Sequence, residues 1–456
     1  MIRSPLDQAP STLARHAKET LHIGLPLAGA QLAQMAMGVT DTIYLGRLGP
    51  EALAAGGLGT SLEITVLVTL QGVAGVVGVF IAQARGADRE TDIPALFWSA
   101  CVLALVLSLP AFALLSATEN LLLALGEPAP LARDAGIFLD TLRWCVPGAM
   151  LGLGLMRAVL PAIGSGWLIL PVTLAATLLN GLAGYALTFG HWGLPALGIR
   201  GPATATVIVS TLGAAALIAL AYTPRRRHLV RWARPRLALV RANLRLGLPI
   251  GALLAVETGL FVAVALLIGR LGPVALAAQQ VAISVVSIAF MVPLGIAQAA
   301  NIRVGHFVGA SDRAGARAGG LVAIALGAGV EFCCALLNWC APESLAGLYL
   351  GRDQGGARHL AASLLQIAAV FQVADGVQCV AAGSLRGLGD TRVPFLLAAI
   401  GYWAIGFPAA WLLTIAAGAS GAWSGLAAGL LVTATLLTAR FARRTSSDRA
   451  IDRLRV

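Results

Sequence analysis

Five acidic side chains interrupt the apolar stretches of this 456-residue chain, and their chemistry is the first indication of function. They are Asp41, Glu63, Glu257, Glu331 and Asp375. No lysine or arginine lies within the same stretches at a helical spacing that would neutralise them. An ionised carboxylate inside an apolar helix costs a few kcal/mol unless a proton or another cation neutralises it. Acids at such positions therefore predict a site that binds or relays a cation.

Asp375 and Glu257 have the strongest surroundings for this role. Gln372 and Gln378 lie three residues before and after Asp375, so one helical face presents a carboxylate between two amides. Oxygen ligands of this kind suit a dehydrated Na⁺ or a relayed proton. Glu257 follows Pro249 by eight residues, and a proline frees a backbone carbonyl one turn earlier and can kink the helix. We expect Glu257 and Asp375 to couple to Na⁺ or H⁺ and to form the Na⁺ site if the ion is Na⁺.

Asp41 is the third candidate for coupling. Gln34 lies two helical turns before it, and Asn180 offers an amide in a later apolar stretch. We expect several amides to line the path of a substrate or a cation, namely Gln34, Asn180, Gln280, Gln372 and Gln378.

The elements that carry these residues are predicted to be membrane-spanning helices. The chain is 58% hydrophobic and 12% charged, with a mean hydropathy of +0.83, whereas soluble domains contain about 25% charged residues. Its uncharged runs are long enough for spans of about 20 residues each. The breaks at glycine, proline and charge clusters predict twelve helices, near 22–46, 54–84, 93–117, 134–158, 166–189, 197–222, 244–269, 276–306, 316–340, 358–384, 392–415 and 420–440.

An internal repeat divides these helices into two sets of six. The segment GRLGPEALAA begins at Gly46, and GRLGPVALAA begins 223 residues later at Gly269. The same spacing relates Pro26 to Pro249 and Gly86 to Gly309, which predicts a duplicated unit of about 220 residues. We expect an all-α polytopic membrane protein of two six-helix bundles, related by a pseudo-two-fold axis along the membrane normal. The predicted parts are an N-terminal bundle (1–222), a basic linker (223–245), a C-terminal bundle (246–445) and a tail (446–456).

The arginines predict how the chain sits in the membrane. The formal net charge is +11, and eight basic residues lie in the linker between Arg225 and Arg245. By the positive-inside rule, the linker and both termini are cytoplasmic. Residues 1–20 are polar and resemble no cleavable signal. We expect a multi-pass protein of the bacterial inner membrane whose linker meets anionic inner-leaflet lipids, with no nucleic-acid partner.

The residues that several kinds of catalysis and cofactor binding require are absent from the sequence. Lys18 is the only lysine, so the chain has no phosphate-binding loop of the Gly-Lys type and no Schiff-base lysine in a span. The six histidines and six cysteines are scattered without metal-ligand spacing. A membrane enzyme would need a clustered nucleophile, base or metal ligands. We expect a protein that is not an enzyme and needs no cofactor beyond a coupling ion.

Several motifs together resemble one family. Leu25-Pro26 precedes Asp41-Thr42 and GRLG, while Leu248-Pro249 precedes Glu257 in the second half. Asp375 is followed by AAGSLRG at positions 381–387. Over essentially its whole length the chain resembles MATE (multidrug and toxic compound extrusion) transporters, closest to their NorM-like bacterial branch.

The resemblance implies a fold and an activity. It implies a V of two bundles around a central cavity, and export of cationic amphiphilic drugs or dyes in exchange for Na⁺ or H⁺ by alternating access. It places one cation site at Glu257 and Asp375 and a second acidic site at Asp41 with Asn180. A related branch carries an acid one turn after that asparagine, where this chain has Gly184, which favours the C-terminal pair. We expect a monomer.

Two acids and two other transporter classes lie outside this pattern. Glu63 and Glu331 match no family motif, so we interpret them as hydrogen-bonded structural acids and expect Glu331→Gln to keep most transport. A lipid-linked oligosaccharide flippase of the same superfamily would need a cationic cavity. A major-facilitator transporter would carry a characteristic basic motif after its second helix, which the segment RGADRET from Arg85 does not match. The coupling ion and the substrates stay open.

Overall fold

The protein is described here by a computed structural model that covers residues 13–351 and 355–446. All regular structure in these residues is helical, which confirms the expected all-α polytopic class. The predicted tail, apart from Ser446, and the first twelve residues lie outside the described part of the chain.

The described helices can be compared with the twelve spans that the hydropathy pattern predicts. Ten helical segments are long and apolar enough to span a membrane. The last of these, Arg392–Ser446, has 55 residues and would extend about 80 Å as one helix. Its helical geometry breaks at Ala417 and Gly418, where Gly418 has a φ of +57°, and this break separates the expected helices 392–415 and 420–440. The twelfth is α1 (Leu13–Leu48), which is 36 residues long and carries the polar residues that lower its hydropathy.

The first six crossings use ten helices. A π-helical turn at Met150–Met156 separates α7 from α8. The helices after α1 are α2 (Pro50–Ala74), α3 (Val77–Gly86), α4 (Ile93–Ser116), α5 (Thr118–Ala124), α6 (Ala129–Leu142), α7 (Val146–Ala149), α8 (Arg157–Ala162), α9 (Ile169–Phe189) and α10 (Arg200–Ala221).

The last six crossings follow a short connection. They are built from α12 (Leu237–Gly269), α13 (Pro273–Gly309), α14 (Arg313–Cys340), α15 (Pro342–Gly347), α16 (Gly355–Gly387), α17 (Arg392–Ala399), the π-helical segment η6 (Ile400–Gly406) and α18 (Phe407–Ser446). Because α12 begins seven residues before the expected position 244, the linker is shorter than the predicted 223–245. It contains α11 (Arg227–Val230) and is tied to α4, since Trp98 Nε1 donates to the Arg231 carbonyl at 3.2 Å.

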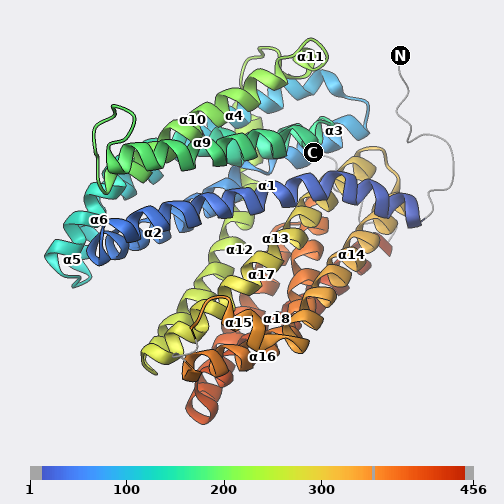
Figure 1. Ribbon diagram of the computed structural model, residues 1–456. Helices are drawn as coiled ribbons and strands as arrows, with labels where there is room; N and C mark the ends of the chain where they lie inside the picture. The colour runs from blue at the N-terminus through green and yellow to red at the C-terminus, as the bar shows by residue number, and fades with distance from the viewer. Residues whose placement is uncertain (1–12, 352–354, 447–456) are drawn as a thin grey trace.

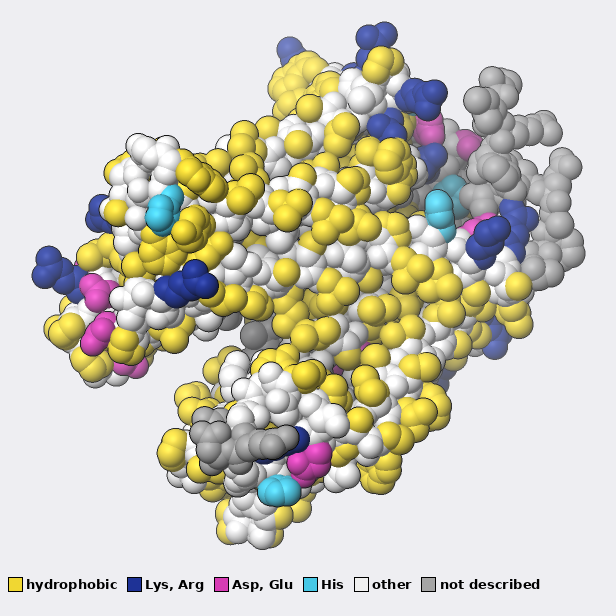
Figure 2. Space-filling model, in the orientation of Figure 1, with side chains coloured by type: hydrophobic (Ala, Val, Ile, Leu, Met, Phe, Trp, Pro, Cys, Tyr) yellow, Lys and Arg dark blue, Asp and Glu magenta, His cyan; other side chains and the backbone are white. Residues whose placement is uncertain are grey.

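The helices form two arms that meet at one end and diverge at the other (Figure 1). The first arm contains α1 to α10 and the second α12 to α18. The start of α1, the end of α3 and α11 lie at the closed end, whereas α5 and α15 lie at the open end. Figure 2 shows the molecule hollowed between the arms, with apolar side chains along their flanks and most charged side chains toward the ends. Exposed residues such as Leu178 and Leu266, 70% and 68% accessible, suit contact with lipid.

Glycines at the closed end reveal the two-fold relation between the arms. A Cβ on Gly86 of α3 would lie 1.9 Å from the His306 carbonyl oxygen, and one on Gly309 of α13 would lie 2.0 Å from that of Gln83. Gln83 and His306 are themselves 223 residues apart, so each half makes the same contact on the other. Only glycine permits so close an approach of two backbones.

A buried arginine adds polar contacts to this junction. Arg303 of α13 is 6% exposed. It donates to the His16 carbonyl at 2.7 Å, to the Thr20 hydroxyl at 2.6 Å and to Glu19 Oε2 at 2.7 Å, all on α1. The two arms are therefore joined at the closed end by both close packing and an ion pair.

Candidate cation-coupling site

The structure brings Glu257 and Asp375 together, as the sequence predicts. Glu257 lies on α12 and Asp375 on α16, and one amide nitrogen connects them. Gln378 Nε2 donates to Glu257 Oε1 at 2.9 Å and to Asp375 Oδ1 at 3.2 Å. Asp375 and Gln378 are 4% and 2% exposed. Two carboxylates therefore share one donor in the interior of the second arm.

Three further side chains surround this pair. Tyr402, on the π-helical segment η6, is fully buried, and its hydroxyl has no hydrogen-bond partner among the described residues. Cys379, which follows Gln378 on α16, is also buried. Arg386 lies about three turns beyond Asp375, near the closed end of α16, and is half-buried.

Asp41 of α1 forms a second polar centre in the first arm. Asn180 Nδ2 of α9 donates to Asp41 Oδ1 at 2.8 Å, and the Thr206 hydroxyl of α10 donates to Oδ2 at 3.1 Å. Asn180 is fully buried. The predicted association of Asp41 with Asn180 is therefore present, and Thr206 is an additional member.

The position of Gly184 has a packing reason. The Tyr44 hydroxyl donates to the Gly181 carbonyl at 2.9 Å, and a Cβ on Gly184 would lie 3.1 Å from the Tyr44 ring. The Tyr44 ring therefore packs against α9 at Gly184, one turn after Asn180.

The other predicted amides lie in different environments. Gln372 is 1% exposed and accepts a hydrogen bond from Asn338 Nδ2 at 2.7 Å. Gln34 has a buried Oε1 without a partner in the described residues. Gln280 is exposed on α13, and no contact of its side chain with the carboxylates is found in the described part of the chain.

The two remaining acids differ from each other. Glu63 Oε1 accepts a hydrogen bond from the Cys145 thiol at 3.6 Å, in keeping with a structural acid. Glu331 is fully buried, yet neither of its oxygens has a hydrogen-bond partner within residues 13–351 and 355–446. The interpretation of Glu331 as a structural acid stays a prediction, and the donor nearest to it on α16 is the unpartnered amide nitrogen of Gln372.

Comparison with known proteins gives the family. The profile of the MatE family matches residues 26–186 and 249–412, one match in each arm. The chain belongs to the MatE family. A probable multidrug resistance protein NorM of Burkholderia pseudomallei is 50% identical over 444 residues, covering 96% of this chain and 95% of that protein. The multidrug resistance protein NorM of Burkholderia vietnamiensis is 47% identical, with 96% of both chains covered.

Solved structures of MATE transporters share the fold. A mutant of the Vibrio cholerae MATE transporter VcmN superimposes with a TM-score of 0.87 at 19% identity, covering 96% of this chain and 99% of that one. The eukaryotic transporter AtDTX14 gives a TM-score of 0.86 at 19% identity, covering 97% and 100%. The match to MatE confirms a transporter rather than an enzyme and excludes the major-facilitator alternative.

Two hydroxyl groups of this MatE protein were missed at the sequence level. Thr206 and Tyr402 stand in spans for which no acid was noted. Buried carboxylates need hydrogen-bond donors. Hydroxyl side chains in the uncharged spans could therefore have been considered as donors to the acids on other helices. Within the described residues, no group of three or more His, Cys, Asp or Glu side chains is arranged to hold a metal ion.

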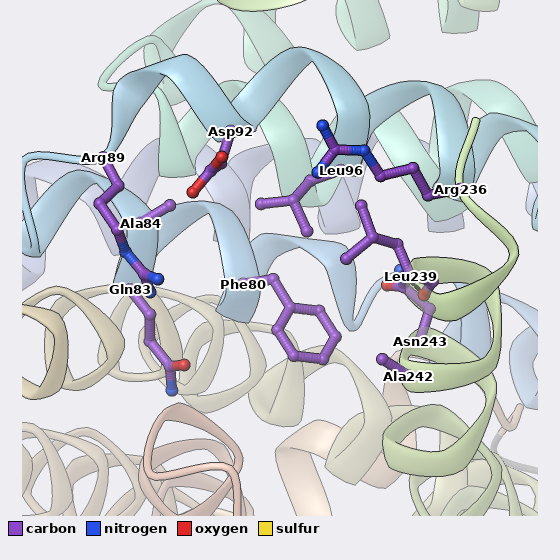
Figure 3. Close-up of a pocket in the computed structure, with 10 residues that line it drawn as sticks. All are labelled: Phe80, Gln83, Ala84, Arg89, Asp92, Leu96, Arg236, Leu239, Ala242 and Asn243. Carbon is purple, nitrogen blue, oxygen red and sulfur yellow. Dashed lines mark hydrogen bonds between the residues drawn. The ribbon is translucent and has the colours of Figure 1, made fainter. Parts of the chain in front are cut away.

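A separate cavity of about 220 Å³ lies at the closed end, between α3, α4 and α12. Figure 3 shows Arg89 and Arg236 on opposite sides of it, with Phe80 between them and Asp92 above. Asn243, at its inner side, is fully buried, and its Oδ1 has no partner in the described residues. The cavity combines two guanidinium groups with an apolar floor.

Proposed function

We propose that this MatE protein exports cationic amphiphilic compounds in exchange for Na⁺ or H⁺. The observation that carries the proposal is the pair of carboxylates, Glu257 and Asp375, joined by the single amide of Gln378 in the second arm. The multidrug resistance proteins to which the chain is 50% and 47% identical support the substrate class.

The coupling mechanism follows from repulsion between the two acids. Two desolvated carboxylates that share a donor disfavour the state in which both are charged. The pair therefore rests with one acid neutral, and a bound cation allows both to ionise. The two acids should behave as one titrating unit rather than as independent groups.

Exchange needs only competition for this negative charge. A cavity with carboxylates and few cations attracts a lipophilic cation, and its apolar walls add affinity without fixed geometry. Na⁺ or H⁺ that reaches Glu257 and Asp375 removes this attraction, and the drug leaves. Asp41, with Asn180 and Thr206, gives the first arm a second negative centre for the drug.

The proposed orientation has the closed end in the cytoplasm of a bacterial cell and the open end facing outward. Arginines of the linker, among them Arg225, Arg231 and Arg245, support it through the positive-inside rule. Arg89 and Arg236, at the cavity of Figure 3, suit the phosphate of an anionic inner-leaflet lipid whose chains lie on the apolar floor. The protein acts as a monomer, since each chain carries both arms.

Dye efflux from proteoliposomes tests this function. Purified protein is reconstituted with a fluorescent lipophilic cation, and an inward Na⁺ gradient and an inward proton gradient are imposed in separate experiments. We expect at least one gradient to drive dye out of the cytoplasmic-side compartment against its own concentration gradient. Dye movement that neither gradient accelerates would contradict ion-coupled export.

A further inference from the structure

Glu331 is an acid whose charge nothing in the described part of the chain balances. It lies in the middle of α14, and its side chain is fully buried with both oxygens unpartnered. A carboxylate at the depth of the hydrocarbon core without donors is strongly disfavoured while it is charged. The side chain therefore has to carry a proton or another cation when the transporter is in this conformation.

The packing of α14 on α16 directs this side chain toward the coupling pair. A Cβ on Gly376 of α16 would lie 2.6 Å from Glu331 Cγ and 3.0 Å from the Gly327 carbonyl oxygen. Glu331 thus lies directly on Gly376, the residue that follows Asp375.

Two amides continue this polar strip toward the open end. Gln372 lies one turn before Gly376 on α16, and Asn338 lies two turns after Glu331 on α14. Asn338 Nδ2 donates to Gln372 Oε1 at 2.7 Å. Gln372 Nε2 has no hydrogen-bond partner among the described residues and faces the Glu331 carboxylate. The strip then continues through Asp375 to Gln378 and Glu257.

We propose that the Glu331 carboxylate is a second binding station for the coupling cation, between the open end and the Glu257–Asp375 pair, and that the Gln372 amide stabilises this carboxylate when the cation has left. In the described part of the chain Glu331, Glu257 and Asp375 do not form one three-acid metal site. The station is therefore separate from the pair, and the cation moves from the station to the pair. Asn338 holds Gln372 so that its free amide hydrogen faces Glu331. This inference rests on the proposed cation exchange.

Glu331→Gln tests the station, because it removes the charge and keeps the shape. We expect gradient-driven efflux in proteoliposomes to fall at least tenfold, while equilibrium dye binding and thermal stability stay within about twofold and a few degrees of the parent protein. The matched control is Glu63→Gln, an acid of the first arm that has its own donor in Cys145; this variant should keep normal efflux.

A second variant disturbs the station while Glu331 itself is kept. Gly376→Ala places a methyl group 2.6 Å from Glu331 Cγ and should slow efflux severalfold. Gly329→Ala, on the same helix as Glu331 with nothing within 4 Å of the added methyl, should not. If Glu331→Gln lowers efflux only under the proton gradient, or only under the Na⁺ gradient, the result supports the station and identifies the ion that it binds.

Near-normal efflux of Glu331→Gln under both gradients would overturn the station. Loss of dye binding together with efflux would also overturn it, because that result indicates a structural acid. Failure of the proposed function gives a different result. If coupling through the pair is wrong, Glu257→Gln and Asp375→Asn also retain gradient-driven efflux. If only the station is wrong, those two variants are inactive.

Discussion

Glu257, Asp375 and Asp41 each accept a hydrogen bond from a side-chain donor, and the two arms supply these donors differently. In the second arm one amide of Gln378 serves both Glu257 and Asp375. In the first arm two donors, Asn180 and Thr206, serve the single carboxylate of Asp41. In the first arrangement two carboxylates divide one donor, whereas in the second each oxygen of one carboxylate has a donor of its own.

The Thr206 hydroxyl should therefore contribute to binding of a cationic drug. Thr206→Val removes one donor from Asp41, and hydrogen bonds to charged groups contribute about 1.5–3 kcal/mol. We expect dye affinity to weaken about tenfold in an equilibrium binding titration. Thr204→Val is the control, because the Thr204 hydroxyl bonds only the Arg200 carbonyl of its own helix. Equal affinities in the two variants would show that Thr206 does not support Asp41.

At the scale of elements, the junction of α3 with α13 depends on the absence of side chains. The backbones of Gly86 and Gly309 approach carbonyl oxygens of the opposite arm, at positions related by the 223-residue repeat. The repeat thus has a physical reason at these positions, since both halves must supply a glycine for the reciprocal contact.

Gly309→Ala should destabilise this junction. The added Cβ would lie 2.0 Å from the Gln83 carbonyl oxygen, and overpacking of this kind costs about 1–3 kcal/mol. We expect a lower midpoint of thermal unfolding in detergent. Gly213→Ala, on α10 with nothing within 4 Å of the new methyl, should leave the midpoint unchanged. An unchanged midpoint for Gly309→Ala would mean that the arms do not meet here in solution.

Hydropathy and the repeat predicted the helices well, because both depend on local composition. The expected helix at 166–189 coincides with the observed span Gly166–Phe189, and the break near 417 follows from Gly418. The early start of α12 at Leu237 was not predictable, since the arginines before 244 resemble a loop. The π-helical segment that carries Tyr402 also has no signal in hydropathy.

The candidate site was predictable in its acids and not in its donors. Glu257 and Asp375 stand out because a charge in an apolar span is costly. Gln378 could be placed beside Asp375 by helical spacing alone, but its contact with Glu257 depends on how α12 and α16 pack. The burial of Glu331 with both oxygens unpartnered is a property of the packed bundle, and no spacing in the sequence indicates it.

At the scale of the whole molecule, the V closes at the end that carries the linker. Two hydrogen bonds connect α4 to the ends of α11 and α12. Trp98 Nε1 donates to the Arg231 carbonyl, and the Arg236 backbone N–H donates to Ser99 Oγ. A change between open and closed arms therefore has to pivot around a junction that includes the linker as well as α3 and α13.

The orientation of this V can be tested with reporters of membrane topology. A reporter inserted near Arg234, in the exposed linker, should report the cytoplasm, because arginines are retained on that side. A reporter inserted near Gly193, between α9 and α10, should report the opposite side. Cytoplasmic signals from both positions, or an external signal from the linker, would contradict the proposed orientation.

The carboxylate pair is tested most directly by comparing Glu257→Gln, Asp375→Asn and the double variant in folded, reconstituted protein. Gradient-driven dye efflux and equilibrium dye binding are measured for each. Because the two acids act as one unit, each single variant should lose gradient-driven efflux as fully as the double variant, while weak dye binding persists through the apolar walls and Asp41. Near-normal gradient-driven efflux in either single variant would contradict coupling through Glu257 and Asp375.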